Sequence, residues 1–98
     1  MNLTKKEALI LQQLVSAGSR ELYGLEMVRE SAGELKLGSI YVTLGRLEDK
    51  GFVESHKEDN PEQVVPRRLY KVTSRGARVH RAWTSAMSVY DSHLLEAI

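Results

Sequence analysis

Apolar residues recur at intervals of three and four along several stretches of this chain, which is the spacing of one face of an α-helix. Thr4 and Glu7 fit a capping box, so a first helix is expected over about residues 4–17. A shorter second helix is expected over about residues 23–31. Residues 34–37 alternate in character and could form either a brief strand or an extended connector.

A third helix is expected from Gly38 to Lys50, because its apolar residues fall on one face. This stripe consists of Ile40, Leu44 and Leu47. Polar residues follow the same helical spacing on another face, namely Ser39, Thr43, Arg46 and Lys50. One short helix therefore combines a buried stripe with a row of hydrogen-bonding groups.

Two strands are expected next, over residues 52–57 and 67–72, on either side of a polar loop that contains Pro61 and Pro66. The simplest arrangement is a hairpin with a long tip. In the second strand, the alternation of side chains places Lys71 on the same face as Arg67.

A final helix, with Thr73 as its N-cap, could extend almost to Ile98. Its apolar stripe is too long for a solitary surface helix, so a second copy of the chain is the expected partner. The predicted dimer contacts are Val79, Trp83, Ala86, Tyr90 and Leu94. The chain would then consist of a DNA-binding unit over residues 1–73 and a dimerisation helix over residues 74–98.

The order of these elements is that of a winged helix-turn-helix, a mainly α fold with a small β-hairpin (α+β). In this fold the third helix enters the major groove of DNA and the hairpin, or wing, reaches the adjacent backbone. Winged helices also serve as protein-interaction modules, so the order alone leaves both functions open.

Composition adds limits to this interpretation. The 98 residues suffice for one compact domain, and 42% hydrophobic and 28% charged residues are ordinary for a folded chain. No apolar run reaches the roughly 18 to 20 residues of a membrane span, and the N-terminus lacks a signal peptide, so a cytoplasmic location is expected. The absence of cysteine excludes disulfides and thiolate chemistry.

The net charge of +1 conceals an uneven distribution. Residues 58–62 carry three acids and no base, whereas residues 67–81 carry six bases and no acid. A basic block without local acids favours contacts with phosphate over a merely solubilising surface.

The candidate DNA contacts combine the polar row with neighbouring basic and aromatic side chains. They are Lys36, Ser39, Tyr41, Thr43, Arg46, Lys50, Arg67 and Arg68. Hydroxyls near the start of a helix suit phosphate or base edges, and Arg46 could contact either guanine or phosphate. Tyr41 could equally pack at the edge of the core, and Gly45 leaves a bare patch that would allow close approach to a groove.

Other chemistry finds little support in the sequence. The three histidines, His56, His80 and His93, lack the spacing of a metal site, and no cofactor or catalytic motif is visible, so we expect neither a metal nor an enzyme. Trp83 is interpreted as a buried interface anchor, with a planar apolar effector as the alternative.

Several segments together resemble the PadR-like transcriptional regulators. They are Leu22-Tyr23-Gly24-Leu25-Glu26-Met27, Gly38-Ser39-Ile40-Tyr41, Leu44, Arg46-Leu47-Glu48, Gly51-Phe52-Val53, and Arg67 to Thr73 with Gly76. The resemblance implies a homodimeric regulator, usually a repressor, that binds palindromic DNA and in some relatives responds to phenolic or drug-like ligands. It favours Ser39, Tyr41 and the row ending at Lys50, with Arg67 and Arg68 on the wing. Val42 stands where many relatives carry a proline.

Overall fold

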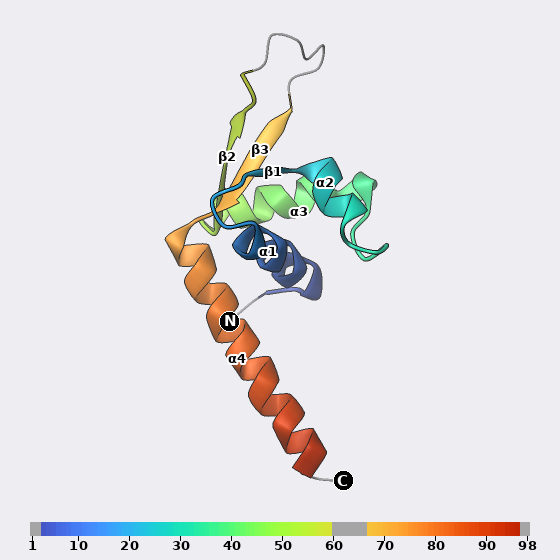
Figure 1. Cartoon of the computed structure of the whole chain (residues 1–98), viewed down its shortest axis with the longest axis vertical. Helices are drawn as coiled ribbons and strands as arrows, with labels where there is room; N and C mark the ends of the chain where they lie inside the picture. Colours follow the sequence, from blue (N-terminus) through green and yellow to red (C-terminus); the bar gives the residue numbers. More distant parts are fainter. Residues whose placement is uncertain (1–2, 60–66, 97–98) are drawn as a thin grey trace.

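The computed structural model describes residues 3–59 and 67–96, with side-chain surroundings up to residue 89. Within these residues the chain forms four helices and three short strands (Figure 1). In order they are α1 (Lys5–Ala17), β1 (Leu22–Tyr23), α2 (Gly24–Arg29), α3 (Leu37–Asp49), β2 (Val53–Lys57), β3 (Arg68–Val72) and α4 (Ser74–Glu96). The winged helix-turn-helix expected from the sequence is therefore present.

The start of α1 is fixed by its capping box. Thr4 Oγ1 accepts a hydrogen bond from the Glu7 backbone N–H at 3.1 Å, and Glu7 Oε1 accepts one from the Thr4 N–H at 2.9 Å. Two backbone donors that helix geometry leaves without partners are thereby satisfied. The predicted boundary is confirmed to within a residue.

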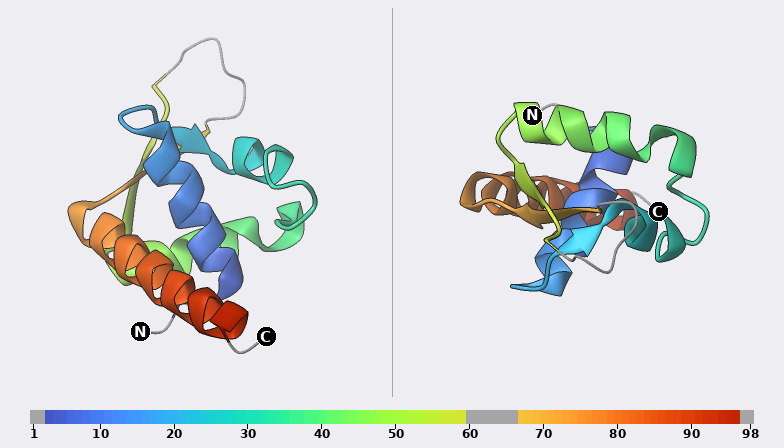
Figure 2. Two further views of the ribbon diagram at one scale, coloured as in Figure 1. Left: turned by 60° about the horizontal axis from the view of Figure 1, so that its bottom comes forward. Right: turned by 90° about the horizontal axis from the view of Figure 1, so that it is seen from above.

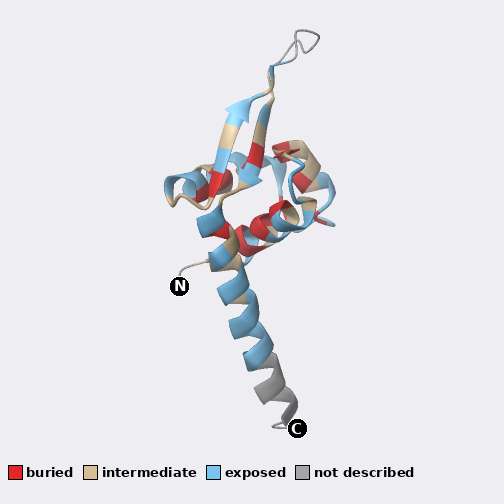
Figure 3. Cartoon of the chain, turned by 60° about the vertical axis from the view of Figure 1, so that its left-hand side comes forward, coloured by how far each residue is buried: buried red, intermediate tan, exposed pale blue. Residues whose placement is uncertain are grey.

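The core lies where α1, α2, α3 and the sheet meet (Figure 3). The predicted stripe of α3 is confirmed, because Ile40, Leu44 and Leu47 are each at most 1% exposed. The other buried apolar members are Ile10, Leu11, Leu14, Leu22, Met27, Leu35, Val53 and Tyr70. Burial of side chains from every one of these elements fixes the orientation of α3 against the rest of the fold.

The segment between α2 and α3 is a turn and contains no strand. Ala32 and Gly33 have φ angles of 52° and 86°, in the left-handed region. The buried hydroxyl of Ser31 accepts a hydrogen bond from the Leu35 N–H at 3.0 Å. This side chain replaces the backbone partner that a strand would have supplied.

The wing is part of a three-stranded antiparallel sheet with the order β1-β3-β2. In the hairpin, Val53 pairs with Val72 and Lys57 pairs with Arg68, which confirms the two predicted strands. The additional strand β1 is only two residues long and pairs Leu22 with Tyr70. The expected loop with Pro61 and Pro66 lies outside the described residues.

The last helix is anchored at its first turn and then extends away from the domain (Figures 1 and 2). Thr73 Oγ1 accepts from the Gly76 N–H at 3.0 Å and donates to the Gly51 carbonyl at 2.7 Å. Gly76 lies so close to Phe52 that an added Cβ would be 2.0 Å from the Phe52 carbonyl oxygen. The helix also packs against α1. No described helix is both long enough and apolar enough to span a membrane.

Candidate nucleic-acid interface

Three sides of α3 remain outside the core, and they differ in their surroundings. With about 100° between successive residues, Val42 points roughly opposite to the stripe of Ile40 and Leu44. It is 57% exposed, and Arg46 one turn later is also exposed. We call the side that contains Gly38, Val42, Gly45 and Arg46 the outer face of α3.

Ser39 and Thr43 of the predicted polar row face sideways, toward α1. Ser39 and Thr43 are half-buried, and Thr43 Oγ1 donates a hydrogen bond to the Ser39 carbonyl at 3.1 Å. Together with Val42 and Arg46, they line a hollow of about 460 Å³ whose opposite wall is the start of α1. That wall is formed by Thr4, Lys5 and Lys6. The sequence identified the polar side chains of α3 but not the two lysines that accompany them.

Lys50, the last member of the predicted row, contacts the interior of the protein. Its Nζ donates to Glu7 Oε2 at 2.8 Å, and the Glu7 side chain is only 3% exposed. Burial by itself would raise the pKa of Glu7, but hydrogen bonds from Lys50 and Thr4 outweigh it, and the pKa lies below its ordinary value. In this structure Lys50 therefore neutralises a buried carboxylate.

Tyr41 lies on the other side of α3, next to α2. Its ring rests on Gly24, where an added Cβ would be 2.8 Å from both Cζ and Oη of the tyrosine. The residue is nevertheless 52% exposed. The ring therefore packs at the edge of the fold, as one of the two sequence interpretations expected, while much of the side chain faces solvent.

The basic residues of the wing are less free of acids than the sequence suggested. Arg67 forms two hydrogen bonds with Glu58, at 2.7 and 3.1 Å, and its guanidinium lies 4.3 Å from the centre of the Tyr23 ring. Lys71 forms an ion pair with Glu54 at 3.3 Å. The expectation of an unpaired basic block was wrong here, because one acid comes from β2 and the other from the residue that follows it.

Arg68 is an exposed basic residue of the wing that is linked to α3 through one side chain. Its Nη1 donates to Ser55 Oγ at 3.2 Å, and Ser55 in turn donates to Glu48 of α3. It lies on the same face of β3 as buried Tyr70, because side chains two residues apart share a face. Lys36, the N-cap residue of α3, is exposed at the other end of the helix.

The predicted contacts therefore separate into two groups. The first group is spread over different sides of α3 and the adjacent wing, and it consists of Lys36, Ser39, Tyr41, Thr43, Arg46 and Arg68. Lys50 and Arg67 are held by acids of the fold. Val42 was missed as a candidate, although its position opposite the apolar stripe could have identified it.

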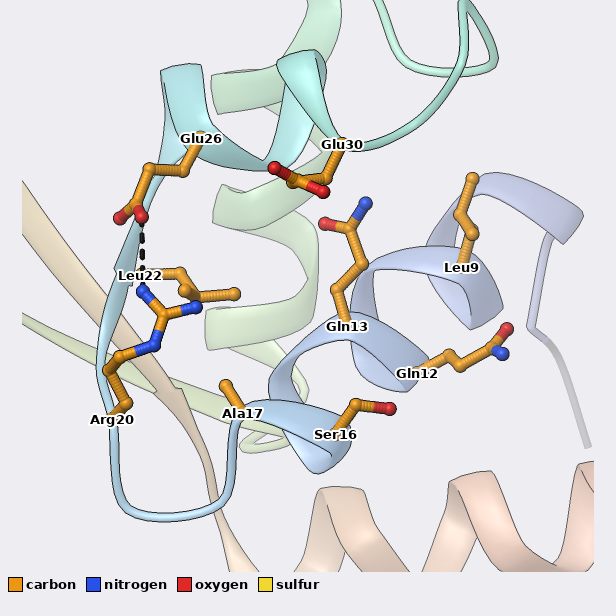
Figure 4. Close-up of a pocket in the computed structure, with 9 residues that line it drawn as sticks. All are labelled: Leu9, Gln12, Gln13, Ser16, Ala17, Arg20, Leu22, Glu26 and Glu30. Atoms are coloured by element: carbon orange, nitrogen blue, oxygen red, sulfur yellow. Dashed lines mark hydrogen bonds and ion pairs between the residues drawn. The ribbon is translucent and has the colours of Figure 1, made fainter.

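A second hollow, of about 470 Å³, lies between α1 and α2 (Figure 4). Arg20 and Glu26 form an ion pair there at 3.1 Å. Gln13 donates to the Met27 carbonyl, while its Oε1 has no hydrogen-bond partner among the described residues.

Trp83 lines a different and smaller hollow, of about 260 Å³, between α4 and α1.

The predicted dimer contacts lie along α4, and the described ones differ in exposure. Val79 and Trp83 are half-buried, whereas Ala86 is exposed. The side chains of Tyr90 and Leu94 lie outside the described residues. Met87 and Val89 are 41% and 58% exposed, so α4 carries apolar surface beyond its contact with α1.

Comparisons with known proteins agree with this geometry. The sequence matches the transcriptional regulator PadR-like family over residues 10–82. A PadR-like transcription factor from Bacteroides fragilis has a similar structure, with a TM-score of 0.79 at 17% identity over 95% of this chain and 89% of that one. A PadR family transcription regulator from Clostridium difficile gives a TM-score of 0.76 at 24% identity over 92% and 94%.

The PcaV transcriptional regulator from Streptomyces coelicolor, solved with its natural ligand, also has a similar structure. Its TM-score is 0.76 at 22% identity, over 98% of this chain and 63% of that one. At such identities the structural likeness establishes the fold alone. No functionally curated protein is significantly similar in sequence.

Proposed function

Because this chain belongs to the PadR-like family of transcriptional regulators, we propose that it is a sequence-specific repressor that binds a palindromic operator as a homodimer. Members of this family regulate transcription and are not enzymes. The observation that carries the proposal is the outer face of α3, which the fold leaves exposed and which includes Arg46. Repression would follow from occupation of a promoter.

In this proposal α3 lies in the major groove and the wing follows the adjacent backbone. Arg46 reaches either a guanine edge or a phosphate. Lys36, at the start of α3, and Arg68 of β3, beside the other end of α3, neutralise phosphates on either side. Tyr41 and the hydroxyls of Ser39 and Thr43 supply polar contacts along the walls of the groove.

The proposed dimer is supported by the exposed apolar surface of α4. Met87 and Val89 flank the predicted stripe on either side, and a second copy of the chain could cover this apolar surface of a helix that projects from its own domain. Two-fold symmetry would then place the two α3 helices about one DNA turn, roughly 34 Å, apart.

Selection of bound sites from random double-stranded DNA tests this function most directly. We expect enrichment of an inverted repeat with half-sites about 10 base pairs apart. Affinity for the selected site should decrease steeply with salt, because binding releases counterions from the phosphates. No enrichment, or an affinity that does not change with salt, would favour the alternative of a winged-helix protein-interaction module.

The dimer is tested separately by replacing an exposed apolar residue of α4. Val89→Glu should give a monomer in analytical ultracentrifugation and weaken operator binding, because a charge would be buried in the interface. Ser19→Glu, in the exposed loop between α1 and β1, is the control and should remain dimeric. A dimeric Val89→Glu protein would remove this part of α4 from the interface.

A small aromatic effector that releases the DNA is a further part of the proposal. The hollow beside Trp83 supports it, since Ala8 and Leu9 supply apolar walls next to the indole ring. Titration with a panel of phenolic compounds should quench Trp83 fluorescence and lower operator affinity together. Release of DNA without quenching would place the effector elsewhere.

A further inference from the structure

Two glycines on the outer face of α3 have no explanation within the fold. Gly38 lies in the first turn of the helix and Gly45 in its interior, and neither has a positive φ angle, unlike Gly18. A Cβ added at either position would meet nothing within 4 Å among the described residues. Glycine disfavours helix formation, so an alanine at either position would suit the isolated protein better.

Other glycines of the chain are required by close contacts within the fold. An added Cβ at Gly24 would collide with the ring of Tyr41, and one at Gly76 would collide with the carbonyl of Phe52. At those positions the missing side chain allows a close contact that the fold itself makes. The bare backbone at Gly38 and Gly45 is suited to an equally close contact with something outside the chain.

Val42 lies between these glycines on the same face, four residues after Gly38 and three before Gly45. It is 57% exposed, so an isopropyl group projects from a helix surface that is bare one turn before it and one turn after it. Arg46 follows on the same face, and Asp49 at the end of the helix is an acid that DNA phosphates would repel. The closest approach should therefore involve the first three turns of α3.

The floor of the major groove has a matching feature. Thymine presents a C5-methyl group there, and it is the apolar group by which a T·A pair differs from the other base pairs. A small branched side chain on a bare helix face can contact that methyl group, whereas a longer neighbour would hold the helix away from the bases. Charge supports the same occupant, because exposed Lys36 and Arg46 accompany this face.

We propose that α3 enters the major groove along the line of Gly38, Val42 and Gly45, with the Val42 side chain against the methyl group of a thymine. The inference rests on the proposed function, and it assigns part of the protein's sequence specificity to Val42. Base reading is thereby centred on Val42, while the row of Ser39 and Thr43, which faces α1, contacts the backbone wall of the groove.

The glycines provide a test in which stability and affinity change in opposite directions. Gly38→Ala and Gly45→Ala should raise the melting temperature or leave it unchanged, because the added methyl groups meet open space. The same variants should bind the selected operator about tenfold more weakly or worse, since the helix can no longer approach as closely. Stable variants that bind the operator as tightly as the wild type would overturn the proposal.

Val42 is tested by removing methyl groups from either partner, one from thymine or both γ-methyl groups from the valine. Each thymine of the selected half-site is replaced in turn by deoxyuridine, which differs only by the C5-methyl group. At one position the wild type should lose about three- to fivefold in affinity, as expected for one buried methyl group. Val42→Ala should show a similar loss on thymine and no further loss on deoxyuridine.

The controls separate this inference from the function on which it rests. Val15→Ala, at an exposed valine of α1, should respond to deoxyuridine as the wild type does. The role of Val42 alone would be overturned if the wild type binds a specific site but no deoxyuridine replacement lowers its affinity. It would also be overturned if deoxyuridine lowers the affinity of Val42→Ala as much as that of the wild type. A chain that enriches no DNA sequence would overturn both the function and the inference.

Discussion

The side of α3 that faces α1 and its outer face each carry one cation, but their residues make different contacts. On the α1 side, Thr43 bonds to the backbone of its own helix and Lys50 bonds to buried Glu7. On the outer face, Val42 is exposed, and the places beside Gly38 and Gly45 are open. The first side is used largely by the fold, and the second makes few contacts within it.

This difference shows why residue type alone does not assign a role. Arg46 and Lys50 are both cations in one helical row, four residues apart. The structure gives Lys50 a buried carboxylate as its partner, while Arg46 is exposed. Substitution of these two residues should therefore separate stability from binding.

The largest effect should come from Lys50→Ala. Breaking a fully buried ion pair costs roughly 3–5 kcal/mol, and we expect about 3 kcal/mol because the Lys50 side chain is 38% exposed. Urea unfolding followed by circular dichroism would measure this loss. Arg46→Ala is the matched control and should remain within about 0.5 kcal/mol of the wild type. Equal losses in both variants would contradict the distinction between the two sides.

The second effect is on DNA affinity and should occur at Arg46. We expect Arg46→Ala to cost about 2 kcal/mol in binding to the selected operator, within the range for one specific contact. Fluorescence anisotropy over a series of salt concentrations would measure it. A loss confined to the operator indicates a base contact, whereas a uniform loss with a shallower salt slope indicates a phosphate contact. Unchanged affinity would exclude Arg46 from the interface.

A smaller effect is expected at Gly24, which contacts the ring of Tyr41, one of the proposed DNA contacts. Gly24→Ala should displace the exposed ring of Tyr41 and weaken operator binding by about 1 kcal/mol, the contribution of one hydrogen bond. In a double-mutant cycle, adding Tyr41→Ala to Gly24→Ala should cause little further loss. Additive losses would show that Gly24 acts independently of Tyr41.

Elements that depend on local signals were predictable from the sequence. The capping box of Thr4 and Glu7 fixed the start of α1, and the stripe of Ile40, Leu44 and Leu47 identified α3. The residues that make up each signal lie within a few positions of one another, so each signal can be recognised without knowledge of distant partners. The two-residue strand β1 has no such signal, because only its pairing with β3 makes it a strand.

The candidate site was predictable to a similar degree, and for the same reason. The exposure of Arg46, and in part that of Tyr41, could be predicted from their positions on the helix. The role of Lys50 depends on Glu7, which is 43 residues away in the sequence, and that of Arg67 depends on Glu58 across the hairpin. Charge counts along a sequence cannot reveal such partners, which are set by tertiary packing.

The smallest expected effect is the pH dependence of the ion pair between Glu7 and Lys50. A carboxylate whose pKa is lowered in the folded state stabilises that state above its unfolded pKa and loses this contribution as the pH falls through its folded pKa. The free energy of unfolding should therefore decrease as the pH falls below the ordinary carboxyl value of 4.5.

Glu7→Gln isolates this contribution, because an amide can still accept the hydrogen bond from the Thr4 N–H but carries no charge for Lys50. Near neutral pH the variant should be less stable than the wild type, and the difference should shrink in acid, where the wild type loses its carboxylate. Urea unfolding at several pH values would measure both curves. Parallel curves would mean that the charge of Glu7 contributes nothing, and that the side of α3 facing α1 depends on packing alone.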